Sequence, residues 1–198
     1  AEAYAAGTGS ISYTGGSGED SLTFGDDLAS INGSATFNMS LGGNNTFVAG
    51  EDAAINSGSL SYTGGSGDDS LTFDDYLAFQ GSTATFDMSR GGNNTLVAED
   101  FAAGLSGSLS YTGGSGDDNL TFGDDLAYDG SATFDMSLSG NNTFMAGFNA
   151  AMSSGSLVYT GGSGEDSLTF GDGLARTSGT ATFDMSLGGN NTFVAGTY

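Results

Sequence analysis

The sequence predicts an all-β fold, a β-solenoid of about eight coils, and three observations lead to this prediction. First, Gly-Gly pairs at 15–16, 64–65, 113–114 and 161–162 are spaced by 49, 49 and 48 residues, so four long repeats fill the chain. Second, each long repeat divides into two units of 24–25 residues. Third, apolar and polar residues alternate within each unit, which is the pattern of strands with one buried face.

An internal alignment defines the shorter unit. The stretch "GSISYTGGSGEDSLTFGDDLA" at 9–29 aligns with "GSATFNMSLGGNNTFVAGEDAA" at 33–54 once one residue is inserted near Gly42. Units of this length are too small to bury a core alone, so like units are expected to stack and share one. We therefore expect a single domain over residues 1–198. Its double repeats lie at approximately 9–57, 58–106, 107–154 and 155–198.

Two strand-like runs and two turns make up each unit. In the first unit, Ile11 and Tyr13 alternate with polar residues, and Leu22 and Phe24 do so again after the glycine-rich turn. One coil per unit would stack like strands in parallel about 4.8 Å apart, giving a rod of roughly 38 Å. Antiparallel hairpins in a meander would alternate in the same way and remain the structural alternative. The tyrosines beside the Gly-Gly turns are expected core residues: Tyr13, Tyr62, Tyr111 and Tyr159.

Composition excludes several classes of function. The 198 residues include 24 acidic and only 2 basic side chains, with a net charge of −22, which excludes nucleic acid as an obvious partner. Histidine, lysine and cysteine are absent, so acid–base and nucleophilic chemistry would rest on carboxylates and hydroxyls alone, and we predict that the chain is not an enzyme. No stretch approaches the roughly 18 apolar residues of a membrane span. The start, "AEAYAAGTGS", resembles a chain after signal-peptide removal and predicts an extracellular or cell-surface protein.

Stacking of coils turns equivalent positions into vertical neighbours. At the first turn of each unit, acidic pairs then alternate with asparagine pairs along the rod. This alternation lets asparagine side chains hydrogen-bond to the carboxylates between them, so the turns could be stable without metal. The pairs are Glu19-Asp20, Asn44-Asn45, Asp68-Asp69, Asn93-Asn94, Asp117-Asp118, Asn141-Asn142, Glu165-Asp166 and Asn190-Asn191.

At the second turn, acidic pairs occupy five successive units, where facing side chains would repel. Oxygen-rich columns without basic partners suit Ca²⁺, which takes six to eight oxygen ligands. The sequence therefore predicts calcium binding at both turns, and the alternative is a solvated acidic edge that keeps the rod soluble. The second-turn pairs are Asp26-Asp27, Glu51-Asp52, Asp74-Asp75, Glu99-Asp100 and Asp124-Asp125. The candidate ligands are Glu19, Asp20, Asp68, Asp69, Asp117, Asp118, Glu165 and Asp166 at the first turn, and Asp26, Asp27, Asp74, Asp75, Asp124 and Asp125 at the second.

The stretch "GGSGEDSLT" at 15–23 returns in closely similar form at 64, 113 and 161. These four copies resemble the calcium-binding nonapeptide G-G-x-G-x-D-x-L-x of RTX proteins, which are secreted β-roll proteins. The resemblance implies that Asp20, Asp69, Asp118 and Asp166 are calcium ligands, together with backbone carbonyls. RTX proteins repeat the nonapeptide back to back, whereas each copy here stands alone in a 49-residue period. A looser, architectural likeness is to curli-type subunits of extracellular fibres.

Both ends of the sequence read as ordinary repeat. The last residues are "TATFDMSLGGNNTFVAGTY", and the first, "AEAYAAGTGSISY", resemble the inter-unit segment "EDAAINSGSLSY". We expect copies of the chain to stack head to tail into a filament that calcium stabilises, for matrix such as biofilm or for adhesion. The alternatives are a monomeric calcium-binding module of a larger adhesin and an ice-binding protein. The outward hydroxyl rows for ice binding would be Ser21, Thr23, Ser70, Thr72, Thr121, Ser167 and Thr169.

Overall fold

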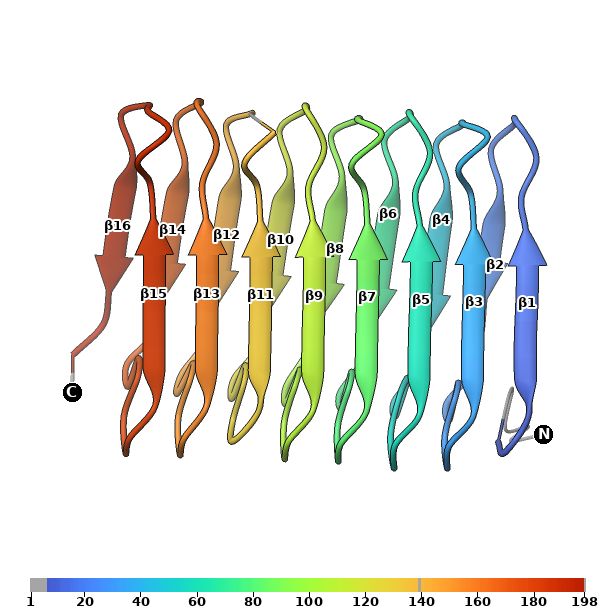
Figure 1. The fold of residues 1–198 in the computed structure, drawn as a ribbon, viewed down its shortest axis with the longest axis horizontal. Coiled ribbons are helices and arrows are strands. Elements are labelled where there is room, and N and C mark those ends of the chain that lie inside the picture. Colours follow the sequence, from blue (N-terminus) through green and yellow to red (C-terminus); the bar gives the residue numbers. More distant parts are fainter. Residues whose placement is uncertain (1–6, 139, 198) are drawn as a thin grey trace.

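In the computed structural model, which describes residues 7–138 and 140–197, the chain winds into a parallel β-solenoid of two facing sheets (Figure 1). Each coil holds one odd-numbered and one even-numbered strand. The first sheet contains β1 (Ser10–Thr14), β3 (Ser34–Asn38), β5 (Ser59–Thr63), β7 (Thr83–Asp87), β9 (Ser108–Thr112), β11 (Ser131–Asp135), β13 (Ser156–Thr160) and β15 (Thr180–Asp184). The second sheet contains β2 (Ser21–Thr23), β4 (Thr46–Ala49), β6 (Ser70–Phe73), β8 (Thr95–Ala98), β10 (Asn119–Phe122), β12 (Thr143–Ala146), β14 (Ser167–Phe170) and β16 (Thr192–Ala195).

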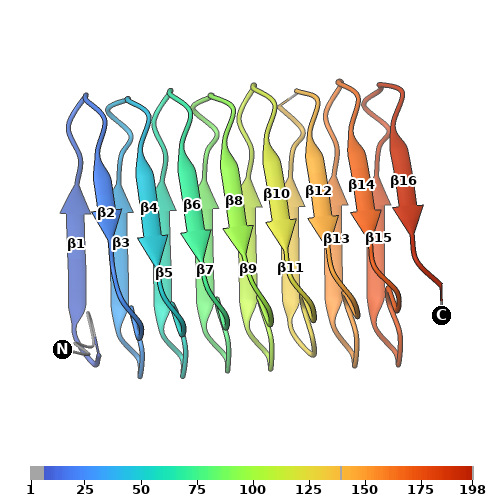
Figure 2. The same ribbon diagram turned by 180° about the vertical axis from the view of Figure 1, so that it is seen from behind.

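Every neighbouring pair of strands in both sheets is parallel and in register. Ile11 stands opposite Ala35 and Tyr13 opposite Phe37 in the pair of β1 and β3, and this relation repeats along the rod. The prediction of a β-solenoid with about eight coils is confirmed, and the antiparallel alternative is wrong. Figure 2 shows the second sheet from behind, with β1 and β16 at opposite ends of the rod. Within the described residues there is no helix with the length and apolar character needed to cross a bilayer.

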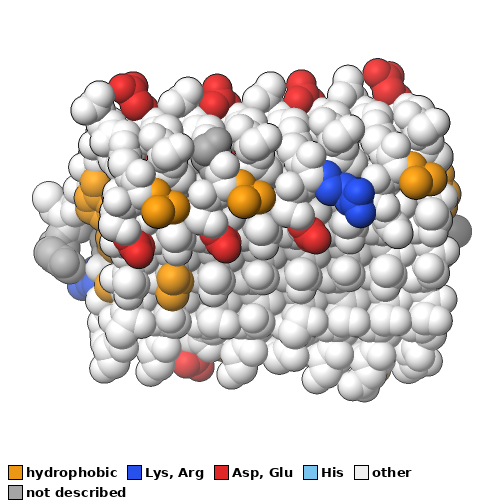
Figure 3. Space-filling model, turned by 45° about the horizontal axis from the view of Figure 1, so that its top comes forward, with side chains coloured by type: hydrophobic (Ala, Val, Ile, Leu, Met, Phe, Trp, Pro, Cys, Tyr) orange, Lys and Arg blue, Asp and Glu red, His pale blue; other side chains and the backbone are white. Residues whose placement is uncertain are grey.

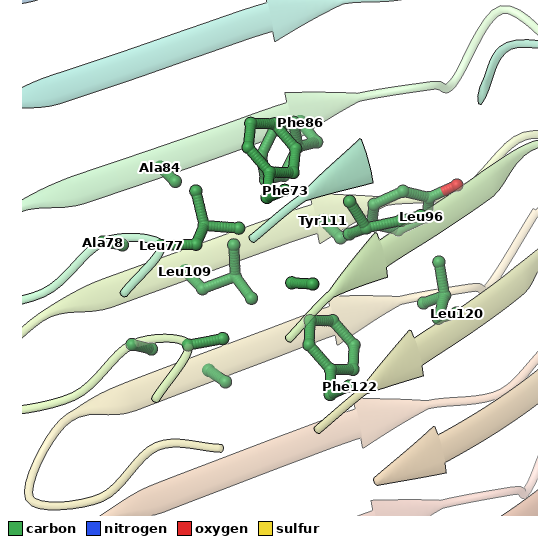
Figure 4. Close-up of a cluster of buried hydrophobic side chains, with 14 of the residues drawn as sticks. Phe73, Leu77, Ala78, Ala84, Phe86, Leu96, Leu109, Tyr111, Leu120 and Phe122 are labelled. Atoms are coloured by element: carbon green, nitrogen blue, oxygen red, sulfur yellow. The ribbon is translucent and has the colours of Figure 1, made fainter. Parts of the chain in front are cut away.

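The core lies between the two sheets, where alternate residues of each strand point inward. Phe86, Tyr111 and Phe122 are at most 3 % exposed and lie between strands of opposite sheets (Figure 4). Aromatic rings meet across the core, as Phe134 and Phe144 do with ring centroids 4.8 Å apart. Because phenylalanine and tyrosine stack at the same position of successive coils, the core is continuous along the rod, which confirms the prediction of core tyrosines for Tyr62, Tyr111 and Tyr159.

Two edges join the sheets, and they differ in chemistry. The loops that follow odd-numbered strands form the ladder edge, at the top of Figure 1. The loops that follow even-numbered strands form the return edge, at the bottom. The ladder edge spans residues 15–20, 39–45, 64–69, 88–94, 113–118, 136–138, 140–142, 161–166 and 185–191. The return edge spans residues 24–33, 50–58, 74–82, 99–107, 123–130, 147–155 and 171–179.

The return edge places non-glycine residues in the left-handed region of backbone space. Ala29 has a φ of 57° and Ala127 also has one of 57°, at equivalent positions of their coils. A side chain in this region costs about 1 kcal/mol or more, so surrounding contacts must hold it there. Hydrogen bonds between coils do so: the Asp27 amide donates to the Glu51 carbonyl at 2.9 Å, and the Ala127 amide to the Ala102 carbonyl at 2.8 Å.

Candidate functional site

The ladder edge contains a buried column in which aspartate alternates with asparagine. We call it the inner column: Asp20, Asn45, Asp69, Asn94, Asp118, Asn142, Asp166 and Asn191. The members from Asn45 to Asp166 are only 1–2 % exposed, whereas the two in the end coils are partly exposed. Four aspartates thus alternate with four asparagines along the length of the rod.

Asp69 shows how a buried carboxylate of this column is satisfied. Its Oδ1 accepts hydrogen bonds from the backbone amide and the side-chain Nδ2 of Asn45, at 2.9 and 2.8 Å. Its Oδ2 accepts from the backbone amide of Gly65 at 3.0 Å, and its own amide donates to Asn94 Oδ1 at 3.1 Å. The pattern recurs at Asp118 and Asp166. The predicted bonding of asparagine side chains to the carboxylates between them is therefore confirmed.

A second, exposed column runs beside the first. The Asp68 amide donates to Asn44 Oδ1 at 2.9 Å, and the Asn93 amide donates to Asp68 Oδ1 at 2.7 Å. The acids of this outer column are Glu19, Asp68, Asp117 and Glu165, separated by Asn44, Asn93 and Asn141, with Asn190 at the end. Figure 3 shows acidic side chains spaced along this edge, with white groups between them. The two columns together form the acid–amide ladder.

Burial sets the electrostatics of the inner column. Desolvation raises the pKa of Asp69 above its usual value, and the hydrogen bonds from Asn45 and Gly65 act in the opposite direction. Desolvation likewise raises the pKa of Asp118, against the hydrogen bonds from Asn94 and Gly114. The amide neighbours therefore supply what a buried carboxylate needs, namely N–H donors without a second negative charge.

The tyrosine hydroxyls next to the ladder have different surroundings in the interior coils and in the first coil. Those of Tyr62, Tyr111 and Tyr159 are buried and have no hydrogen-bond partner among the described residues. Burial raises the pKa of these phenols far above the usual value. In the first coil, the Tyr13 hydroxyl instead donates to Asp20 Oδ1 at 3.2 Å. In the interior coils the corresponding oxygen accepts from an asparagine of the preceding coil, as Asp69 Oδ1 does from Asn45.

The return edge carries acids in consecutive coils without intervening amides. Their Oδ1 atoms accept backbone amides of the next coil: Asp124 donates to Asp100 at 2.7 Å, and Phe148 to Asp124 at 2.8 Å. Sequence reasoning did not foresee these bonds. We call this row the return column: Asp26, Glu51, Asp75, Asp100, Asp124, Phe148, Asp172 and Thr197.

The expected second-turn pairs stack with a shift of one residue in the third and fourth coils. Asp74 and Glu99 take the place that glycine holds in other coils, since the Asp74 amide bonds to the Ala49 carbonyl and the Glu99 amide to the Phe73 carbonyl. Tyr76 and Phe101 then stand where the second acid was expected. Asp27, Asp52 and Asp125 thus do not form a continuous row, and burial with neighbouring carboxylates raises the pKa of Asp52.

Aromatic side chains occupy the third and fourth coils of the return edge, between Asp52 and Asp125. The rings of Tyr76 and Phe101 are stacked at 5.4 Å with an interplanar angle of 12°, and Phe79 meets Tyr76 edge-on at 4.9 Å. They line an open concavity of about 510 Å³ together with Asp52, Ile55, Asn56 and Gln80. The only sequence signal for it was the departure of "DDYLAFQGS" from "DDLAYDGS" at the equivalent turn.

The predicted calcium ligands of the inner column already have protein partners. Both oxygens of Asp69, Asp118 and Asp166 accept hydrogen bonds from N–H donors. Over residues 7–138 and 140–197, no group of three or more acidic side chains lies together. The outer acids are separated by amides, and acids of the return column already accept backbone amides. Calcium binding at the predicted acids of both edges stays a prediction.

The end coils expose side chains that are buried everywhere else. Tyr13 is 36 % exposed and Phe193 is 49 % exposed, whereas their counterparts Tyr62 and Phe144 are at most 1 % exposed. Within the described part of the chain, β1 and β2 pair with a neighbour on one side only, and so do β15 and β16. The predicted junction through residues 1–6 and Tyr198 lies outside the described residues.

Fold and edges define an acidic, two-sheet parallel β-solenoid with an unpaired strand edge at each described end. Comparison with protein-family models gave no match, and neither did comparison with curated proteins or with solved structures.

Proposed function

We propose that this chain is a structural protein whose copies stack head to tail, coil upon coil, into an extracellular filament for matrix or adhesion. The observation that carries the proposal is the pair of unpaired end coils. A second copy that placed β1 against β15, and β2 against β16, would repeat the relation that β15 has to β13 and β16 to β14. Such a contact uses two different surfaces and does not close, so it propagates into a filament.

Exposed strand edges favour this association energetically. An open edge presents unpaired amide and carbonyl groups that can pair with another chain. Stacking would also cover Tyr13 and Phe193, and full burial of a large apolar side chain contributes about 1.5–3 kcal/mol. The side chains of Leu22, Phe24 and Phe183, packed against the core but only partly buried, would be covered in the same step.

Charge opposes stacking and gives cations a role. Each copy carries a net charge of −22, so copies repel one another at long range, and dissolved salt screens this repulsion. We propose that calcium acts in this way, at the acids of the return edge, rather than as a ligand of the inner column.

Electron microscopy of the 198-residue chain tests the proposal. Negative-stain images would be recorded at neutral pH with about 1 mM CaCl₂, a working concentration for weak extracellular sites, and in parallel with EDTA. Filaments in both support stacking without a specific metal, and filaments in calcium alone support calcium dependence. Monomers in both conditions would overturn the proposal and favour the single module of a larger adhesin.

A matched pair of variants on β16 locates the contact. Phe193 pairs with the buried Leu168 and packs against Phe183 with ring centroids 4.9 Å apart. Val194, next to it and similarly exposed at 51 %, pairs with the outward Thr169. We expect Phe193→Asp to abolish filaments and Val194→Asp to leave them. Equal loss in both variants would contradict stacking through the end coil.

Ice binding is a second candidate, favoured by the absence of charge from the second sheet. Its strands contain no acidic or basic residue although the chain carries −22, and threonine and serine alternate with inward apolar residues along them. Thr23, Thr72 and Thr121 lie on this outward face, and the intervening coils place Val48 and Val97 between them and Met145 after Thr121. Thermal hysteresis in the wild type that is lost in Thr121→Asp would support this function, and none in the wild type would exclude it.

A further inference from the structure

The two end coils carry opposite halves of the acid–amide ladder. The first coil has the acids Glu19 and Asp20, and the last has the amides Asn190 and Asn191. This follows from an even number of coils, since an odd number would leave acids at both ends. A second copy stacked head to tail therefore continues the alternation without a fault.

The interior of the ladder specifies which atoms would meet. In each interior step an inner asparagine donates its backbone amide and Nδ2 to Oδ1 of the acid in the following coil, as Asn94 does to Asp118 at 2.8 and 3.0 Å. In the outer column the acid's amide donates to Oδ1 of the asparagine before it, as Asp117 does to Asn93 at 2.9 Å. Both relations join the asparagine of one coil to the acid of the coil that follows it.

The end coils hold the unused halves of these relations. Asn191 Nδ2 donates to the Gly188 carbonyl at 2.8 Å, and no acid follows it within the chain. Asp20 Oδ2 accepts from the Gly16 amide at 3.1 Å, but Oδ1 accepts only the exposed Tyr13 hydroxyl among the described residues. The site that every interior carboxylate completes with the preceding coil is thus incomplete at Asp20.

We propose that Asn190 and Asn191 of one copy bind Glu19 and Asp20 of the next, and that this junction sets the direction and register of the filament. Asn191 would donate its amide and Nδ2 to Asp20 Oδ1 of the next copy, and the Glu19 amide of that copy would donate to Asn190 Oδ1. The proposal rests on the proposed head-to-tail function and adds its recognition site.

The side chains of the end coils also disfavour the two other ways in which two copies could meet. Two copies meeting at their first coils would place Asp20 against Asp20 and Glu19 against Glu19, and like charges brought together on adjacent strands repel. Two copies meeting at their last coils would offer amide to amide and would reverse the direction of the paired strands. Only the head-to-tail arrangement gives each carboxylate its donors and keeps the strands parallel.

Tyr13 distinguishes this junction from loose association. In the single chain it is 36 % exposed and donates to Asp20 Oδ1, whereas Tyr111 in the interior is fully buried. Once Asn191 of another copy donates to Asp20 Oδ1, Tyr13 should become buried as Tyr111 is. Hydroxyl-radical footprinting with mass spectrometry should show protection of Tyr13 in filaments, with Tyr111 protected in both states; equal labelling of Tyr13 in filaments and monomers would overturn the junction.

The decisive experiment is a double-mutant cycle on the critical concentration for assembly. Asp20 and Asn191 lie in the first and last coils, at opposite ends of one chain, so they can couple only through contact between copies. Asn191→Asp should raise the critical concentration at least about tenfold, because two carboxylates would meet at the junction. In the background of Asp20→Asn the same substitution should raise it much less.

Asp129→Asn serves as the control for net charge. Asp129 is exposed on the return edge of the fifth coil, so its substitution removes the same charge as Asp20→Asn away from the junction. It should not relieve the effect of Asn191→Asp. If wild type forms filaments but Asp20 and Asn191 act additively, the ladder junction is wrong while stacking stands. If wild type forms no filaments, the proposed function itself fails.

Discussion

The ladder edge and the return edge both stack acidic side chains along the rod, yet they follow different rules. In the ladder, Asp118 is 2 % exposed and has asparagine in the coils before and after it. On the return edge, Asp100 lies between Asp75 and Asp124 in adjacent coils and is partly exposed. The coil spacing is the same at both edges, so access to water decides whether acids can follow one another.

Both edges give their carboxylates backbone donors. The amide of Asn94 reaches Asp118 Oδ1 at 2.8 Å, and the amide of Asp124 reaches Asp100 Oδ1 at 2.7 Å. The inner column adds the side-chain donor of asparagine, and no member of the return column is an asparagine. Water and dissolved ions replace that donor where the carboxylates are exposed, because exposed charges are screened and buried ones are not.

The largest effect should come from a new acid in the sixth coil, placed between two existing acids of the inner column and compared with the same change in the return column. Asn142→Asp would put a carboxylate between the buried Asp118 and Asp166, and Phe148→Asp would put one between Asp124 and Asp172 on the return edge. Asn142→Asp should lower the free energy of unfolding by about 3–5 kcal/mol, the cost of an uncompensated buried charge. Phe148 is 53 % exposed, so Phe148→Asp should change it by less than about 0.5 kcal/mol.

Urea denaturation of both variants in the monomeric state provides the measurement. Asn142→Ala controls for the lost hydrogen bonds of the amide, since it removes the donor without adding a charge. Similar losses in Asn142→Asp and Phe148→Asp would show that proximity of charges, and not burial, governs both edges.

A smaller effect should appear in the dependence of stability on pH. Burial raises the pKa of Asp69 and Asp118 in the folded state above the usual 3.8, and it also raises that of Asp52 and Asp125 on the return edge. Between the two pKa values the folded state binds more protons than the unfolded state. Stability is therefore greatest below the usual value and falls as pH rises through the raised values. Lowering the pH from neutral toward the usual value of 3.8 should raise the unfolding midpoint in urea.

Asp118→Asn tests which edge is responsible for this dependence. If the buried ladder carries it, the variant should show a smaller gain on acidification than the wild type. Asp184, exposed on the first sheet, works in the opposite direction because hydrogen bonds from Ser186 lower its pKa. Stability that falls on acidification would contradict the proposed effect of burial on the ladder carboxylates.

The sequence predicted the ladder edge better than the return edge, for a physical reason. Alternation of Asp69 with Asn94 and Asn45 is visible in the residue types themselves, and parallel stacking fixes which atoms meet. On the return edge the loops reach the next coil through left-handed residues such as Ala29, which no residue pattern announces. The register there shifts by one in the third and fourth coils, so the acids Asp74 and Glu99 leave the row that their pairing in the sequence suggested.

The smallest effect on the free energy of unfolding should come from removing the Tyr111 hydroxyl. The Tyr111 hydroxyl is buried, and no described residue forms a hydrogen bond with it. Phe86 and Phe134 occupy the same position in the coils on either side. Tyr111→Phe should therefore leave the free energy of unfolding unchanged or raise it, by no more than about 1 kcal/mol, since it removes an unpaired polar group. Thermal unfolding measures the difference, with Tyr13→Phe as the control, because the Tyr13 hydroxyl does donate to Asp20. A loss above about 1 kcal/mol for Tyr111→Phe would mean that the phenol has a hydrogen-bond partner. The first candidate is Asp118, whose negative charge has the largest effect among the carboxylates that raise the pKa of Tyr111. The core tyrosine would then stabilise this carboxylate together with the asparagines.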